Sequence, residues 1–179
     1  MAREKPEMSA ARKAAARVSR PSKYQSTNLV PMFREAAAFR RKMRRAGFTD
    51  NGGAIHSAER ILDLLGQRLK YPGLGHRNNL RHYEKAQFSD AAWAAHRRGK
   101  KVLIEHVAPL RDFTRKAIEK IEEGATPDQF EAFVRHHYQL VLLTPAETRH
   151  LNGINRSRMI PGRLASAGIK LVPKAGRLK

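Results

Sequence analysis

Short apolar runs interrupt an otherwise helical pattern and limit how much β-structure this chain of 179 residues can form. Residues 101–105 and 139–143 have the length and composition of buried strands, and residues 168–172 have the pattern of a third, edge strand. Between these runs, apolar residues recur at spacings of three and four, as on the buried face of a helix. The sequence therefore predicts a mainly α protein with a small β element, an α+β fold whose N-terminal half is helical.

Helix boundaries are marked by residues that commonly begin and end helices. Gly47 and Gly124 each follow an amphipathic stretch and predict its end, and Ser89 is placed as an N-cap. Two capping boxes, TPDQ at 126–129 and TPAE at 144–147, each put proline at the first helical position. We expect helices over residues 28–46, 54–71, 80–86, 90–98, 112–123, 127–138 and 145–152.

The composition is strongly basic. Lysine and arginine total 36 against 16 acidic residues, which gives a formal net charge of +20. A chain with this charge repels itself and normally has a polyanion as its partner. No apolar stretch is long enough to span a membrane, so we expect nucleic acid, DNA or RNA, rather than a membrane, with protein partners also open.

Cysteine is absent from the sequence. This excludes disulfide scaffolds, thiolate metal sites and thiol nucleophiles. It also fits a reducing compartment. Together with the basic charge, it predicts a cytoplasmic protein associated with a nucleoid or with ribonucleoprotein.

The charge divides the chain into regions. We expect a disordered basic arm over residues 1–27, a helical basic region over 28–99, an α+β region over 100–173 and a basic tail over 174–179. Residues 28–173 are expected to form one compact domain. The arm has almost no large apolar side chains, so nothing in it offsets the entropy lost on ordering.

Basic residues outside the central region are the candidates for contacts with phosphate. The segment FRRKMRR at 39–45 is denser in charge than a solvated helix face requires, and no acidic residue follows Glu147. Phosphate contacts fix the position of a nucleic acid without reading its sequence. The candidates are Arg12, Lys13, Arg17, Arg40, Arg41, Lys42, Arg44, Arg45, Arg149, Arg156, Arg158 and Arg163.

One constellation has the residue types needed for catalysis. Glu105 and His106 follow the first apolar run directly, and Pro109 comes three residues after the histidine. The second run continues into a short helix, LVLLTPAETRHLNG at 140–153. This order, over residues 101–153, resembles the HNH or His-Me finger nucleases, in which a β-hairpin and a following helix hold one divalent metal ion.

The resemblance implies roles for individual side chains. His106 would be the general base that takes a proton from water attacking a phosphodiester. Glu105 and His150 would bind Mg²⁺ or another divalent metal, and Asn152 is available on the same helix. The alternative is a structural pair, in which Glu105 is ion-paired with an arginine and His106 donates to a backbone carbonyl.

Three functions therefore remain open at this stage. The first is a nucleic-acid-binding protein that contacts the phosphate backbone as a structural or regulatory part of a nucleoprotein assembly. The second is an enzyme, a metal-dependent endonuclease of the HNH type. The third is an accessory or inhibitor protein that binds an acidic protein surface.

Overall fold

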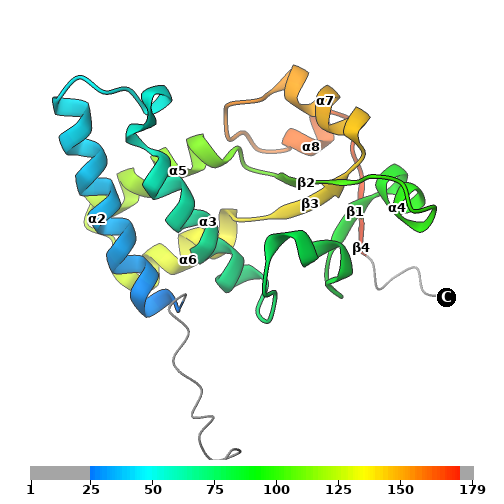
Figure 1. Ribbon diagram of the computed structural model, residues 1–179, viewed down its shortest axis with the longest axis horizontal. Coiled ribbons are helices and arrows are strands. Elements are labelled where there is room, and N and C mark those ends of the chain that lie inside the picture. The colour runs from blue at the N-terminus through cyan, green and yellow to red at the C-terminus, as the bar shows by residue number, and fades with distance from the viewer. Residues whose placement is uncertain (1–24, 174–179) are drawn as a thin grey trace, which may run out of the picture.

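The structure is a computed structural model that describes residues 25–173 (Figure 1). Its helices are α2 (Ser26–Arg45), α3 (His56–Lys70), α4 (Asp90–Arg97), α5 (Leu110–Glu122), α6 (Pro127–His137), α7 (Pro145–Ile154) and α8 (Arg163–Ser166). A π-helical turn, η1 (Asp50–Ala54), precedes α3, and a 3-10 helix, η2 (Arg77–His82), follows it. The strands are β1 (Gln87–Ser89), β2 (Leu103–His106), β3 (Leu140–Leu143) and β4 (Leu171–Pro173). The predicted mainly α fold with a small β element is confirmed.

The four strands form one sheet in the order β2-β3-β1-β4. β2 and β3 pair antiparallel, with His106 opposite Leu140, so the end of β2 lies beside the start of β3. β1 runs parallel to β3, and β4 runs antiparallel to β1. Helices α2, α3, α5 and α6 gather at one end of the β2–β3 pair, and α7 and α8 lie over the sheet (Figure 1).

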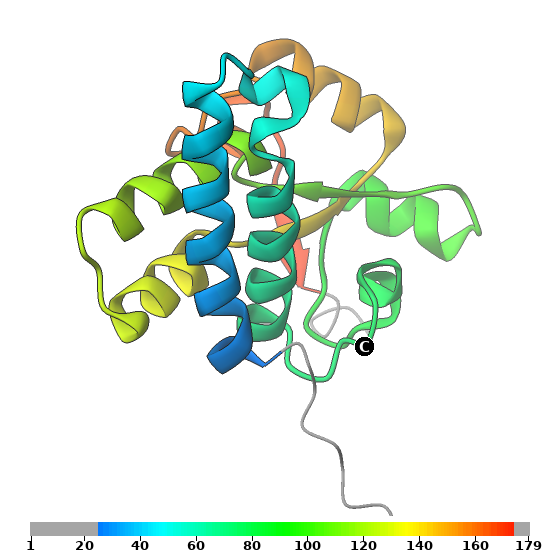
Figure 2. The ribbon, with the colours of Figure 1, turned by 60° about the vertical axis from the view of Figure 1, so that its left-hand side comes forward.

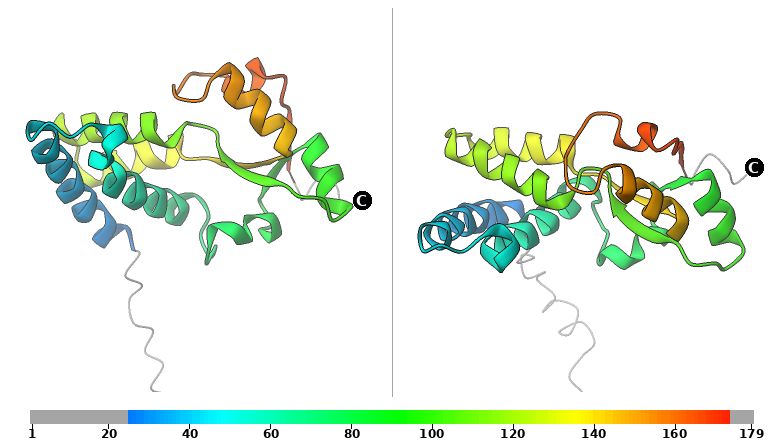
Figure 3. Two further views of the ribbon diagram at one scale, coloured as in Figure 1. Left: turned by 45° about the horizontal axis from the view of Figure 1, so that its top comes forward. Right: turned by 90° about the horizontal axis from the view of Figure 1, so that it is seen from above.

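The four helices at this end form two layers. α2 and α3 run side by side (Figure 2), and α5 and α6 form a second layer against them (Figure 3). The rings of Phe33 in α2 and Phe130 in α6 stack at 5.1 Å between their centroids and join the layers. Both rings are fully buried, which gives each layer a large apolar contact.

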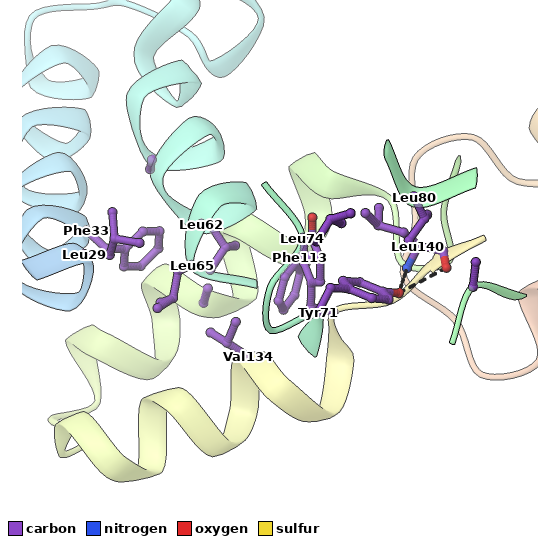
Figure 4. Packing of buried hydrophobic residues seen from close by; sticks show 14 of the residues in the cluster. Leu29, Phe33, Leu62, Leu65, Tyr71, Leu74, Leu80, Phe113, Val134 and Leu140 are labelled. Atoms are coloured by element: carbon purple, nitrogen blue, oxygen red, sulfur yellow. Dashed lines mark hydrogen bonds between the residues drawn. The ribbon is translucent and has the colours of Figure 1, made fainter. Parts of the chain in front are cut away.

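The core is continuous from the helices into the sheet. The main apolar cluster reaches from Leu29 in α2 to Leu142 in β3 (Figure 4). The Tyr71 hydroxyl donates to the carbonyl oxygen of Leu140 at 3.1 Å and accepts from its amide at 2.7 Å, which ties the end of α3 to β3. Val141 and Leu143 belong to a second, smaller cluster on the other face of β3. Because both faces are covered, β3 has the unbroken apolar sequence seen at residues 140–143.

Three points of local structure differ from what the sequence predicted. The helix expected over residues 80–86 is wrong, because the 3-10 helix ends at His82 and the chain then enters β1. β1 was not predicted: three residues carry no readable period, and Phe88 pairs with Leu142, far along the chain. Ser26 and Thr27 belong to α2 rather than to the basic arm.

Candidate functional site

A pocket of about 440 Å³ lies at the end of β2, where the strand meets the start of α5. Glu105 and His106 both line it, so the motif singled out in the sequence faces a cavity. The other lining residues come from α3, α5, α7, α8 and the segment before α8. They are Glu59, Pro109, Leu110, Arg111, Asn152, Arg156, Ser157 and Arg163.

His106 is held by a carboxylate from α3. Its Nε2 lies 2.9 Å from Oδ1 of Asp63, and the Tyr138 hydroxyl donates to the same oxygen at 2.7 Å. Asp63 is only 5% exposed. Burial raises the pKa of Asp63, but the hydrogen bonds from His106 and Tyr138 outweigh it and leave that pKa below its ordinary value.

The carboxylate determines which nitrogen of His106 carries the proton. An ionised aspartate only accepts hydrogen bonds, so Nε2 must be the donor. In neutral His106, Nδ1 is then the nitrogen with a free lone pair. The structural pair considered from the sequence, with a backbone carbonyl as acceptor, is replaced here by a side-chain carboxylate.

A glycine allows α3 to approach the start of β3 closely enough for this contact. Gly66 lies one turn after Asp63, and a Cβ at residue 66 would overlap the ring of Tyr138. Tyr138 is fully buried and lies two residues before the first residue of β3. Glycine costs about 1 kcal/mol relative to alanine within a helix, so its use at this position fits the close approach to the ring.

Glu105 is turned away from Asp63, because adjacent strand residues point to opposite faces. Burial raises the pKa of Glu105, and the charges of Arg163 and His106 oppose this rise without cancelling it. The Thr148 hydroxyl of α7 lies near this carboxylate but is buried without a hydrogen bond of ordinary geometry. Glu105 is therefore a partly desolvated acid beside cationic groups.

Arg163 has a structural part in this pocket. It was predicted as a phosphate contact at the surface, but it is only 3% exposed. Its guanidinium donates to the carbonyl oxygens of Asn155 at 2.8 Å and His106 at 3.0 Å, and to Oδ1 of Asn152 at 3.1 Å. Arg163 thus holds α7, α8 and the end of β2 together while keeping its charge at the pocket wall.

Two further arginines make the net charge of the pocket lining positive. Arg111 at the start of α5 donates through Nε to Glu59 at 2.9 Å and through NH1 to Asn51 at 2.7 Å. Arg156 is exposed in the segment between α7 and α8. With Arg163, three arginines face two glutamates around the pocket, so its lining is net positive even when His106 is neutral.

The predicted metal ligands are not all in this pocket. His150 is exposed and is not among the lining residues, whereas Asn152, two residues along α7, is. Among residues 25–173, no group of three or more His, Cys, Asp or Glu side chains could hold a metal ion. The carboxylate and amide residues that line the pocket are Glu105, Glu59 and Asn152, and Arg111 and Arg163 donate to the latter two.

The predicted basic segment at 39–45 contains both ion-paired and exposed basic side chains. Arg40 binds Asp50 through two hydrogen bonds of 2.8 and 2.9 Å, and Arg41 lies 3.4 Å from Glu122. Lys42, Arg44 and Arg45 are exposed near the end of α2, and Arg149 and Arg158 are exposed on and after α7. Arg12, Lys13 and Arg17 lie outside the described residues.

Sequence reasoning missed Asp63 and Tyr138. The signal for Asp63 is an acidic residue within the apolar run ILDLLG at 61–66, next to Leu62 on the buried side of the helix. A buried charge requires a partner, so this position predicts a hydrogen-bonded carboxylate. Nothing local indicates which residue that partner is.

Comparison of the chain with protein-family models, with curated proteins and with solved structures found no match. In the part of the chain that the structure describes, no helix combines the length and apolar composition needed to cross a membrane.

Proposed function

We propose that this protein binds nucleic acid by its phosphate backbone and that the Glu105–His106 pocket holds one of the phosphates. The observation that carries the proposal is the convergence of Arg111, Arg156 and Arg163, from three separate segments, on one pocket. The exposed Arg156 can present the planar fork of donors that matches the oxygens of a phosphate. Arg111 and Arg163 already donate to protein acceptors and add positive charge at the pocket wall.

The charge of the whole chain supports the same ligand. A formal charge of +20 favours association with a polyanion over association with a small anion, because many phosphates are neutralised at once. The described candidates outside the pocket, such as Lys42, Arg149 and Arg158, are exposed, and we expect them to add contacts with the backbone. A structural or regulatory role in a nucleoprotein assembly follows from this mode of binding.

Arg156→Ala tests the proposal, because Arg156 is an exposed pocket residue. Binding of fluorescent duplex DNA, single-stranded DNA and structured RNA is measured by anisotropy at several salt concentrations. We expect the slope of log K against log salt to fall in magnitude by about 0.9 for duplex DNA and about 0.7 for single strands.

Arg97→Ala is the matched control. Arg97 is an exposed arginine in the last turn of α4, outside the pocket, and its removal changes the net charge by the same amount. The proposal fails if the two variants lose equal affinity, or if the wild-type protein binds no nucleic acid. Binding to an acidic protein that nucleic acid does not displace would favour the accessory-protein function.

A second candidate function is hydrolysis of the phosphodiester at the same pocket. The observation that favours it is the pairing of His106 with Asp63, which leaves Nδ1 as the basic nitrogen of a histidine beside an anion site. In this reaction His106 takes a proton from water as the water oxygen bonds to phosphorus. The P–O bond to the leaving oxygen breaks, and that oxygen takes up a proton from solvent. Arg111 and Arg156 offset the charge that grows on the phosphate. Asp63 acts through His106 as a positioning residue.

The metal implied by the HNH resemblance fits this site only in part. The expected pair of Glu105 and His150 does not line one pocket, so no step is derived through a metal bound in that way. Mg²⁺ keeps several waters and needs only one or two carboxylates together with phosphate oxygens. Glu105 is the pocket carboxylate without a hydrogen-bonded arginine, and a bound Mg²⁺ would supply charge stabilisation there.

Incubation of plasmid DNA and of RNA with the protein and Mg²⁺, Mn²⁺ or Zn²⁺ tests the second candidate. We expect cleavage by the wild type, a loss of about 100-fold or more in His106→Ala, and a smaller loss in Asp63→Asn. Cleavage that survives His106→Ala would remove this function from the pocket. Tight binding without cleavage by the wild type would leave the binding function alone.

A further inference from the structure

A second polar hollow, of about 380 Å³, lies where the end of α2 meets η1 and α5. Its lining residues are Arg40, Arg44, Thr49, Asp50, Asn51 and Arg115. Three arginines face one aspartate, so the lining has a net positive charge. Every lining side chain is polar, which separates this hollow from an apolar docking groove.

Asp50 holds two of the arginines in place. It is 5% exposed, and its carboxylate accepts from Nε of Arg40 at 2.8 Å and from Nε of Arg115 at 2.9 Å. Each guanidinium has five N–H donors, so each keeps further donors after these bonds. The Arg115 side chain is 42% exposed and can reach a ligand from this position.

Arg44 adds a charge that no ion pair offsets in the part of the chain that the structure describes. It is exposed in the last turn of α2 and forms no ion pair within residues 25–173. Two anchored guanidiniums and one free one therefore surround the hollow. Fixing the forks in advance lowers the entropy lost when an anion binds.

A hydrogen bond joins the wall of the hollow to the wall of the Glu105–His106 pocket. Arg111, which lines the pocket, donates to Oδ1 of Asn51, which lines the hollow, at 2.7 Å. Arg111 and Arg115 lie one turn apart on α5, with about 5–6 Å expected between Cβ atoms at that spacing. A chain that carries a regular series of phosphates can contact both places.

We propose that the Asp50-anchored hollow is a second phosphate-binding site for the same nucleic-acid chain, an inference that rests on the proposed function. The nucleic acid then follows a track from Arg44 past Arg115 and Arg111 to Arg156. Asp50 positions the arginines of this track and does not contact the ligand.

Asp50→Asn gives the sharpest test, because simple charge and positioning predict opposite results. Removing an acidic residue raises the net charge, and charge alone would strengthen binding. If Asp50 positions the arginines, affinity for an oligonucleotide falls about 3- to 10-fold instead. Glu84→Gln is the matched control, since it removes an exposed acidic residue that lines neither pocket, and it should leave binding equal or slightly tighter.

Arg44→Gln tests the hollow without removing a contact of the fold. For Arg44→Gln, the slope of log K against log salt should fall in magnitude by about 0.7 on single strands. For Arg97→Gln, this slope should match that of the wild type. The inference is overturned if Asp50→Asn has the same affinity for the oligonucleotide as Glu84→Gln and if Arg44→Gln has the same salt slope as Arg97→Gln. Weaker binding by Arg156→Ala in that case would keep the proposed function, and no binding by the wild type would end both.

Discussion

Two buried aspartates, Asp63 and Asp50, organise neighbouring parts of this molecule in different ways. Both are 5% exposed, and the pKa of each lies below its ordinary value. Asp63 accepts from the imidazole of His106 and from the hydroxyl of Tyr138. Asp50 accepts from Arg40 and Arg115, whose charges are permanent.

The difference shows how the partner decides what a buried carboxylate does. At Asp63 the carboxylate selects one tautomer of a ring that can move protons. At Asp50 the carboxylate fixes two donor forks that bind anions at any pH near neutrality. A buried carboxylate that loses its hydrogen-bonding partners becomes an uncompensated charge. Removing the partners of either aspartate should therefore destabilise the fold.

Asp63→Ala should have the largest effect on stability. It leaves the buried Tyr138 hydroxyl and Nε2 of His106 without their acceptor, and we expect a loss of about 3 kcal/mol in the free energy of unfolding. Urea denaturation measures this loss. Glu84→Ala, an exposed acidic residue, should change stability by less than about 0.5 kcal/mol, and equal losses would contradict the role given to Asp63.

Gly66→Ala should disturb the Asp63 centre without changing a polar group. Because the added Cβ overlaps the Tyr138 ring, the overpacking should outweigh the gain in helix propensity and cost about 2 kcal/mol. Gly153→Ala in α7 is the matched control, since a Cβ there meets nothing within 4 Å. Thermal unfolding should show destabilisation of the first variant and no loss in the second.

Asp50→Asn should have an effect of similar size, and this effect should decrease at low pH. The guanidinium of Arg40 lowers the pKa of Asp50 from 3.8 to about 2, despite the opposing effect of burial. A carboxylate with a lowered folded pKa stabilises above its unfolded pKa and loses this contribution as pH falls through the folded value. We expect the free energy of unfolding of the wild type to exceed that of Asp50→Asn by about 2 kcal/mol at pH 5–7.

This advantage should shrink between pH 4 and pH 2. Urea denaturation at several pH values measures it, with the difference between the two proteins plotted against pH. A difference that stays constant down to pH 2 would mean that Asp50 is not held by its charge. The stabilisation that Asp63 contributes should also decrease as pH falls, since the pKa of Asp63 is lowered as well.

Local signals in the sequence predicted most of the fold. Both capping boxes form as expected, with Thr126 and Thr144 each accepting from the third helical residue. The apolar run that forms β3 was readable because burial on both faces gives it a continuous pattern. β1 escaped prediction because its stability comes from pairing with strands that are distant in sequence.

Only those residues of the candidate site that are neighbours in the sequence could be predicted. Glu105 and His106 stand side by side in the sequence, and both line the pocket. The partner of His106 lies on α3, and no period or spacing links Asp63 to a strand end so far along the chain. For the same reason the sequence selected His150, although the turn of α7 brings Asn152 to the pocket wall instead.

The central claim is that phosphates bind along the arginines from Arg44 to Arg156, through the Glu105–His106 pocket. Nuclear magnetic resonance of the ¹⁵N-labelled protein, titrated with a short single-stranded oligonucleotide, tests this claim directly. The largest saturable shifts of backbone amides should lie at the ends of α2 and β2, at the start of α5 and at residues 155–158. Saturable shifts confined to α4 and β1, with none along this track, would contradict it.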